Sequence, residues 1–287
     1  MTTNVQNNSL GRRAWRKLQT QKFTMACFAV IVLYLFVALL GALDFLPDHR
    51  VEVGESYTKP TWSLAGILGT DFFGYSVLYK ILAGTETAMA IGFLTTAIVI
   101  PLGVIIGAIA GYYGGFIDDA VVFLCTVVNS VPYILMVIAI AYLLGKGLES
   151  MCVAMGVVGW VPLSRLIRAE FMKHKEREYV LASRLLGAND FLLIFKHILP
   201  NVFHLAIITA SLTVLSAIKS EVILTYLGVG ITDGSSWGSM IQAAEKELVT
   251  GVWWPLMGVV LAMFLIIYAL NVAGDALRDA LDPKLVD

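Results

Sequence analysis

Residues 23–43 read FTMACFAVIVLYLFVALLGAL, a run of consecutive positions without one charged side chain. A helix needs about 20 apolar residues to cross the ~30 Å hydrocarbon core of a bilayer. The run is too long for the apolar region of a cleavable signal peptide, and no A-x-A cleavage site follows it. We therefore expect a transmembrane helix that stays in the protein as an anchor.

The rest of the chain has the same character. Hydrophobic residues make up 58% of the 287 positions and charged residues only 14%, and the mean hydropathy is +0.80. A soluble domain carries about 25% charged residues. The net charge of −1 provides no field that would attract nucleic acid. The composition predicts an all-α, polytopic membrane protein.

Five further segments are apolar enough to cross a bilayer, and several of them contain glycine or proline. Membrane helices tolerate these residues where neighbouring helices cover the freed backbone groups. The sequence thus predicts a packed bundle of about six transmembrane helices. The five expected spans are Thr87–Ala110, Ala120–Leu144, Leu148–Ile167, Asn201–Leu227 and Trp253–Ala273.

The spans divide the chain into an N-terminal segment, an anchor helix, a long polar connection, a five-helix core and a tail. The core contains one long internal connection, residues 168–200, which we call the basic connection. The expected boundaries are 1–22, 23–43, 44–86, 87–273 and 274–287.

Lysine and arginine are distributed unevenly about these spans. Fourteen of the 20 lie in the N-terminal segment, around the basic connection and in the tail. Five lie in the other connections, and Lys219 lies within a span. Cytoplasmic loops carry an excess of basic residues. We therefore expect an inner-membrane protein with both termini and the basic connection in the cytoplasm, and with segment 44–86 outside.

The basic connection has the pattern of a helix, a turn and a second helix. Lys175–Leu186 is rich in helix-forming residues and stops at Gly187, which enters the left-handed conformation without steric cost. Asn189 or Asp190 can cap the next helix. Pro200 falls at the start of a span, where its missing N–H costs little. On these grounds alone, an ordinary amphipathic surface loop is an equal alternative.

This pattern resembles the EAA loop of importer-type ABC permeases, E-A-A-x3-G-x9-I-x-L-P. Here the triplet is Leu181-Ala182-Ser183, three residues precede Gly187, and nine more precede His197-Ile198-Leu199-Pro200. Leu181, Ser183 and His197 depart from the family pattern, and Leu181 offers no polar contact in place of the family's glutamate.

Four other stretches resemble the C-type subunit of the peptide/nickel (Opp/Dpp) branch of these permeases, and the resemblance runs from about Lys17 to the C-terminus. Early in the third span that branch usually carries an arginine and an aspartate, where this chain has Phe123 and Thr126. The four stretches are Leu68–Asp71 with Gly74, Gly111–Asp118, Leu227–Gly230 with Ser236–Gly238, and Gly274–Pro283.

The resemblance implies one of two related permease subunits, with two cytoplasmic ATPase subunits and an external solute-binding protein as partners. ATP and Mg would be bound by the ATPases, and the solute would be a peptide or a small solute such as a nickel chelate. It also implies that the basic connection couples the bundle to the ATPases. The coupling residues would be Leu181, Ala182, Ser183, Arg184, Leu185, Gly187, Ala188, Asp190 and Pro200.

Polar side chains within the spans are candidates for the translocation path, namely Asn129, Ser216, Lys219 and Glu221. Charges such as those of Lys219 and Glu221 each cost about 2.5–3.5 kcal/mol at the centre of a membrane helix. Two positions apart, their side chains point in different directions, so they are not expected to form an ion pair. The alternative is that both lie near the membrane interface and extend toward water.

The chain lacks the residues that several other functions require. The chain has no GxxxxGK[ST] loop for ATP and no nucleophile–base set, and Cys27, Cys125 and Cys152 have no metal-ligand spacing. We therefore expect neither catalysis nor a metal site. An ion-driven transporter would be expected to show two inverted halves, and a channel a filter-like segment. Neither pattern is found in the sequence.

Overall fold

The computed structural model describes residues 21–145, 147–231 and 234–281, so that most of the expected N-terminal segment and the end of the tail lie outside it. Within these ranges the protein is helical, as expected, and forms two isolated β-bridges but no strand. Five helices are long and apolar enough to cross a membrane, or six if a bent pair counts as one span.

The helices and their bounds, in chain order, are α2 (Lys22–Ala42), α3 (Val77–Tyr113), α4 (Gly115–Asn129), α5 (Tyr133–Leu144), α6 (Leu148–Gly159), α7 (Val161–His174), α8 (Glu178–Leu185), α9 (Asp190–Leu192), the π-helical turn η1 (Leu193–Ile198), α10 (Leu199–Tyr226), α11 (Trp237–Val249) and α12 (Trp254–Leu281).

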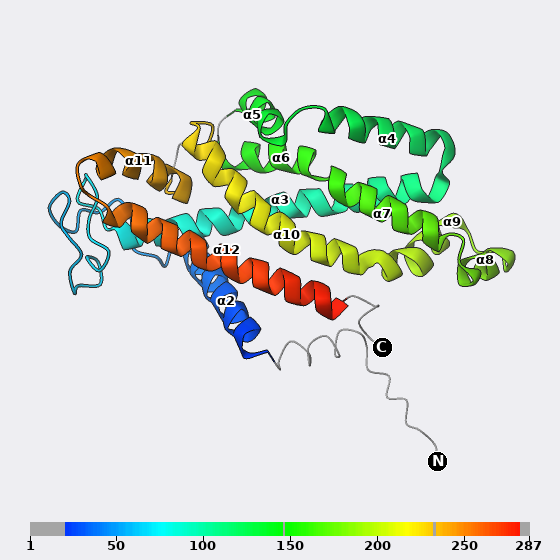
Figure 1. The fold of residues 1–287 in the computed structure, drawn as a ribbon, viewed down its shortest axis with the longest axis horizontal. Helices are drawn as coiled ribbons and strands as arrows, with labels where there is room; N and C mark the ends of the chain where they lie inside the picture. The colour runs from blue at the N-terminus through cyan, green and yellow to red at the C-terminus, as the bar shows by residue number, and fades with distance from the viewer. Residues whose placement is uncertain (1–20, 146, 232–233, 282–287) are drawn as a thin grey trace, which may run out of the picture.

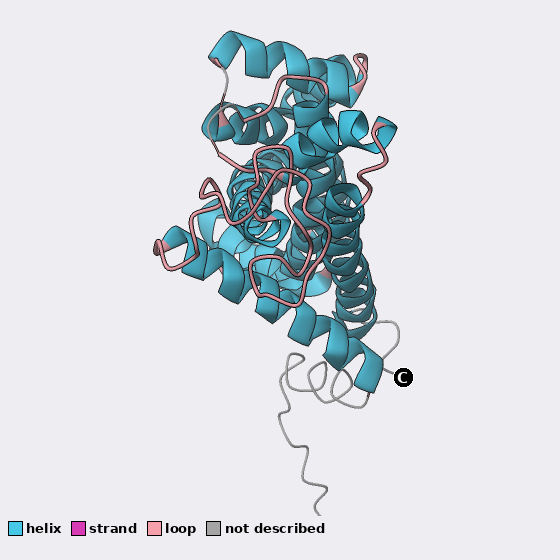
Figure 2. Cartoon of the chain, turned by 90° about the vertical axis from the view of Figure 1, so that its left-hand side faces the viewer, coloured by secondary structure: helices cyan, strands magenta, loops and turns pink. Residues whose placement is uncertain are grey.

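Helices α3, α7, α10 and α12 run along the long axis of the molecule (Figure 1). Helices α8 and α9 lie at one end of this axis, the end toward which α12 runs. We call this the basic end. Segment 44–76 and α11 lie at the opposite end, where loops cross in front of the bundle when it is viewed along the axis (Figure 2).

The second span begins ten residues earlier than expected, at Val77 rather than Thr87. The Ser76 side chain caps this helix by accepting a hydrogen bond from the Tyr79 N–H at 3.4 Å. Lys80 and Glu86 lower the apolar character of the first turns, but Lys80 is neutralised by Asp71 at 2.7 Å. The last ten residues of the expected 44–86 connection are therefore helical.

The expected span over 120–144 is present as a bent pair of helices, and the bend was not predicted. Helices α4 and α5 meet at an angle of 90° across Ser130–Pro132. Pro132 has no N–H to continue the ladder of α4, and its ring disfavours the helical conformation in the preceding residue. The break turns α5 away from the axis of α4.

The remaining spans run longer than expected at the basic end. The fourth continues past Ile167 to His174, with a slight interruption at Trp160, and the sixth continues past Ala273 to Leu281. Helix α11 was not expected. It begins with a capping box in which the side chains of Ser236 and Ser239 each accept a hydrogen bond from the backbone N–H of the other.

Three glycines at four-residue spacing bring α3 against α7. A methyl group at Gly107 would lie 2.5 Å from the Ser164 carbonyl oxygen, and one at Gly111 equally close to the Arg168 carbonyl oxygen. At Gly103 it would meet the Leu163 side chain at 2.9 Å. Small residues at this spacing let two membrane helices approach to backbone contact, so α3 and α7 form a rigid pair.

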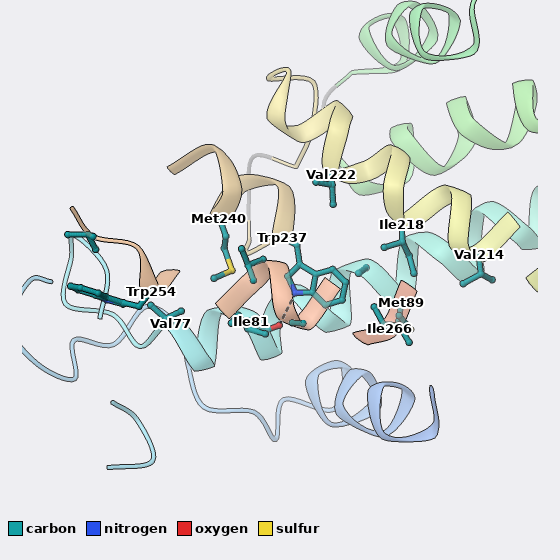
Figure 3. Close-up of a cluster of buried hydrophobic side chains, with 14 residues drawn as sticks. Val77, Ile81, Met89, Val214, Ile218, Val222, Trp237, Met240, Trp254 and Ile266 are labelled. Carbon is teal, nitrogen blue, oxygen red and sulfur yellow. Dashed lines mark hydrogen bonds between the residues drawn. The ribbon is translucent and has the colours of Figure 1, made fainter. Parts of the chain in front are cut away.

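A second core lies on the other side of α3, around the fully buried Trp237. The indole N–H of Trp237 donates to the Ile81 carbonyl at 3.2 Å, which ties the start of α11 to α3 (Figure 3). Val214, Ile218 and Val222 of α10 point into the same cluster. Helices α3, α10, α11 and α12 therefore share one core.

The α3–α7 contact yields a first prediction. Gly107→Ala should lower the stability of the folded protein by about 1–3 kcal/mol, because the added methyl group overpacks a backbone contact that has little room to relax. The measurement is the thermal unfolding midpoint in detergent. Ile109→Ala is the control, since it changes the volume of a side chain in the same helix by more than one methyl group, but at an exposed position. Equal midpoints for the two variants would contradict the close contact.

Candidate functional site

The basic connection folds as two short helices around Gly187. Helix α8 ends at Leu185, and Gly187 takes a left-handed φ of 88°. The Asn189 side chain then caps α9 by accepting from the Leu192 N–H at 2.9 Å. The expected helix–turn–helix, its left-handed glycine and its asparagine cap are confirmed, although the first helix begins at Glu178 rather than Lys175.

A π-helical turn, η1, joins α9 to α10 and ends just before Pro200. Because Pro200 has no N–H, the Lys196 carbonyl four residues earlier loses its usual helical bond. A wider turn with bonds five residues apart is one way for a helix to accommodate such a site. The sequence placed Pro200 at the start of a span, and the structure agrees, but the π-helical turn was not foreseen.

The inner face of the basic connection is anchored by apolar side chains. Val180, Leu193 and Ile198 are fully buried in one cluster with Ile167 and Phe171 of α7. Burial of a large aliphatic side chain contributes roughly 1.5–3 kcal/mol. The connection is therefore packed onto the bundle rather than attached by its two ends alone.

The outer face of the basic connection carries large, exposed apolar side chains. Leu185 and Leu186 are each 89% exposed, and Phe191 is 70% exposed. Phe191 packs against the half-exposed Phe195 in a tilted arrangement, with ring centroids 4.5 Å apart. Exposed apolar patches of this kind characterise protein–protein contact sites. We call these four residues the apolar tip.

Polar contacts fasten the connection to the end of α3. The Tyr112 hydroxyl donates to Asp190 Oδ1 at 2.5 Å and accepts from Arg184 Nη2 at 3.3 Å. Nearby, Arg168 of α7 holds both carboxylate oxygens of Asp118 in α4. Tyr112 and Asp118 both belong to the Gly111–Asp118 stretch singled out in the sequence, but sequence reasoning gave neither a contact.

The other residues expected to couple lie on and around α8. Leu181 and Ala182 are exposed, and the Ser183 hydroxyl bonds within the helix to the Tyr179 carbonyl at 2.9 Å. Tyr179 contacts His174 Nδ1 at 2.8 Å through its hydroxyl. Partial burial raises the pKa of the Tyr179 phenol above its ordinary value. Ala188 packs against the buried cluster.

A cavity of about 650 Å³ lies between α10, the α4–α5 break and helices α3, α6 and α7. Two expected path residues, Asn129 and Ser216, line it from opposite walls. Thr209 and Thr213 add hydroxyl groups to the α10 wall, and Thr213 donates its own to the Thr209 carbonyl at 2.8 Å. The rest of the lining is mostly apolar.

Lys219 and Glu221 do not line this cavity, and they face different surroundings. Lys219 is exposed, whereas Glu221 is completely buried inside the bundle and does not extend toward the surface. Glu221 Oε1 accepts from the Thr225 hydroxyl at 2.9 Å, and Oε2 has no hydrogen-bond partner among the described residues. No basic side chain of the described ranges pairs with Glu221. The expectation that the two would not pair is confirmed.

The stretch Leu68–Asp71, which resembles the family in sequence, has a structural role at the end of the molecule opposite the basic end. We call this the far end. Asp71 Oδ1 accepts from the N–H groups of Phe73 and Tyr75. The Trp254 indole donates to the Thr70 carbonyl at 3.0 Å. Burial and the nearby Asp71 raise the pKa of the Glu247 carboxyl in α11. These contacts attach segment 44–76 to α3, α11 and α12.

The chain matches a known protein family and many individual proteins. Residues 103–287 match the family model described as "Binding-protein-dependent transport system inner membrane component". The dipeptide transport system permease protein DppC of Bacillus subtilis is 38% identical over 275 residues, covering 95% of this chain and 85% of that protein. The oligopeptide transport system permease protein OppC of the same species is 33% identical over 285 residues, covering 96% and 90%.

Two further proteins are also similar to this chain. The glutathione transport system permease protein GsiD of Pectobacterium atrosepticum is 30% identical over 279 residues, covering 96% of this chain and 91% of that protein. Among solved structures, an inward-facing form of the MetNI methionine ABC transporter matches with a TM-score of 0.57 at 16% identity. The match covers 72% of this chain and 98% of that one, and it shows a shared fold.

The surroundings of Glu221 yield a second prediction. Glu221→Gln should leave the unfolding midpoint unchanged or raise it, because an amide keeps the bond from Thr225 and removes a buried charge that has no basic partner. Thr225→Val, which keeps the shape and removes the donor, should lose about 1–3 kcal/mol. If Glu221→Gln were the more damaging change, the charge itself would be needed inside the folded bundle, and this account of Glu221 would be wrong.

Proposed function

The chain belongs to the family of binding-protein-dependent transport system inner membrane components and is an importer-type ABC permease, and we propose that it carries peptides into the cytoplasm. It is a transport subunit and not an enzyme. Relatives that align with nearly its whole length are named dipeptide, oligopeptide and glutathione permeases. These names support a peptide as the solute.

In this proposal the basic connection transmits force from cytoplasmic ATPase subunits. The observation that supports this role is that the connection exposes the apolar tip on its outer face while its inner face is packed onto the bundle. Leu185 and Leu186 are 89% exposed, whereas Val180 and Leu193 are completely buried. An ATPase that binds the tip pushes on a packed body. The contact of Tyr112 with Asp190 passes the displacement to α3 as well as to α10.

One chain does not enclose a translocation path by itself, so further subunits are part of this proposal. A second, homologous permease subunit would complete the path, since the cavity is bounded on this chain by the exposed Asn129 and Ser216. Two ATPase subunits would bind and hydrolyse ATP with Mg, and an external solute-binding protein would deliver the peptide at the far end. Closure of the ATPases would then open the bundle outward in alternating access.

The same proposal places the basic end in the cytoplasm. Arg177, Arg184 and Lys196 lie there, and the excess of basic residues supports this side. A cysteine at Ser56 should react with a membrane-impermeant thiol reagent added outside intact cells, and a cysteine at Lys173 only after the cells are opened. The three natural cysteines are buried, so the unaltered protein gives the background. The reverse pattern of labelling would invert the topology.

Gly187→Val tests the coupling role. A Cβ atom at Gly187 would meet no atom within 4 Å, so the main effect of the change is on the left-handed backbone, which costs a non-glycine residue roughly 1–2 kcal/mol. We expect normal membrane insertion, but at least a several-fold loss of ATP-dependent peptide uptake and of ATPase subunits recovered by pull-down.

Gly251→Val is the matched control. Gly251 has a φ of 87°, has the same open surroundings, and lies at the far end between α11 and α12. Its N–H donates to a carbonyl three residues earlier at 3.0 Å, as that of Gly187 does. It should keep ATPase binding at the wild-type level. Normal uptake and normal ATPase recovery in Gly187→Val would show that the basic connection is only a surface loop.

A further inference from the structure

Helix α10 carries an exposed lysine inside its membrane span. Lys219 lies seven residues before the end of α10 at Tyr226, which is about 10 Å at 1.5 Å per residue. Side chains on a helix tilt toward its N-terminus. Extension of the Lys219 side chain toward the nearer helix end would work against this tilt.

No acidic side chain in the described part of the chain pairs with Lys219. A charged side chain facing lipid is unfavourable, and such residues normally face a bundle interior or an aqueous path. The surface of α10 around Lys219 must therefore meet water, a ligand or another protein rather than hydrocarbon.

The face of α10 that carries Lys219 is separate from the face that packs in the core. Leu212, Ser216, Lys219 and Ile223 follow one another at helical spacing and are all exposed. The opposite face is buried around Trp237 (Figure 3). The exposed face therefore has no packing partner within the described chain.

This face continues into the cavity. Leu212 and Ser216 line the α10 wall, and Asn129 lies on the wall opposite. The Ser216 hydroxyl and the Asn129 amide make no hydrogen bond within the described ranges. Lys219 lies one turn beyond Ser216 toward the C-terminal end of α10, so a charged side chain lies on the same helix face as two residues of the cavity lining.

We propose that Lys219 binds the terminal carboxylate of the transported peptide as it enters the cavity. The inference rests on the proposed peptide transport and adds the group that is recognised. An ammonium ion and a carboxylate form a charge-assisted hydrogen bond, and the Asn129 amide can both donate to and accept from peptide groups. The cavity, at about 650 Å³, lies within the roughly 300–1,000 Å³ range of small-molecule sites.

The first experiment compares uptake of a dipeptide with uptake of its C-terminal amide, which lacks the carboxylate. In Lys219→Gln the preference for the free acid should fall about tenfold, the factor that corresponds to about 1.4 kcal/mol. Lys219→Arg should keep most of the preference because it keeps the charge. Lys246→Gln is the control, since Lys246 is also exposed at the far end but lies in α11, outside the candidate spans.

Each outcome decides one question. If wild-type protein takes up neither compound, peptide transport itself is refuted. If wild-type protein takes up the dipeptide and Lys219→Gln keeps the same preference, transport stands and the role of Lys219 is refuted. If Lys219→Gln no longer copurifies with the second permease, the lysine pairs with that subunit instead, and the proposal is again overturned.

A second measurement does not require the solute-binding protein. It therefore tests Lys219 even if that protein does not bind the C-terminal amide of the dipeptide. In the purified permease–ATPase complex, a cysteine at Lys219 should react with a water-soluble thiol reagent if this face of α10 is wet. In wild-type complex, an amine-reactive reagent should modify Lys219, as read by mass spectrometry. The free dipeptide at millimolar concentration should slow that modification several-fold, and the amide should not. No modification, or equal protection by both compounds, would overturn the assignment.

Discussion

The structure depends on how closely α3 can approach its neighbours. A membrane interior offers no hydrophobic force between helices, so they are held by packing and by hydrogen bonds between them. Gly107 and Gly111 place the backbone of α3 against that of α7, with no room for even a methyl group. Trp237, bonded to the Ile81 carbonyl, fastens α11 to the other side of α3. Loss of either contact would separate the elements that form the cavity from those that form the basic end.

Much of this arrangement could be predicted from the sequence, because the membrane imposes strong and simple rules. Long apolar runs predicted the spans, and Gly187 and Asn189 predicted the turn and cap of the basic connection, since each residue type suits one local backbone geometry. The bend between α4 and α5 at Pro132 was not predicted, because proline alone does not determine whether a membrane helix kinks or breaks. The early start of α3 was hidden because Lys80 is neutralised by Asp71, a contact that apolar runs do not reveal.

The polar residues of α10 show where local sequence stops being informative. Lys219 and Glu221 carry similar insertion costs and lie two positions apart, so the sequence suggested only that they face different directions. Their surroundings depend on which helices pack on each face. Glu221 points into the bundle beside Thr225, whereas Lys219 points to a surface with no partner in the described chain. The buried residue thus has a structural setting, and the exposed one is free to interact with something outside this chain.

The contacts at the basic end constrain how motion can pass through the protein. The basic connection leads directly into α10, so a displacement of the apolar tip would be passed to α10 through the chain itself. Tyr112 joins Asp190 to the end of α3, and Arg168 joins α7 to Asp118 in α4. Four helices are thereby linked within a short distance of the tip, and all four border the cavity. Because α3 and α7 are held together by their glycine contact, they must move as a pair, and the α4–α5 break is left as the natural place for the cavity wall to bend.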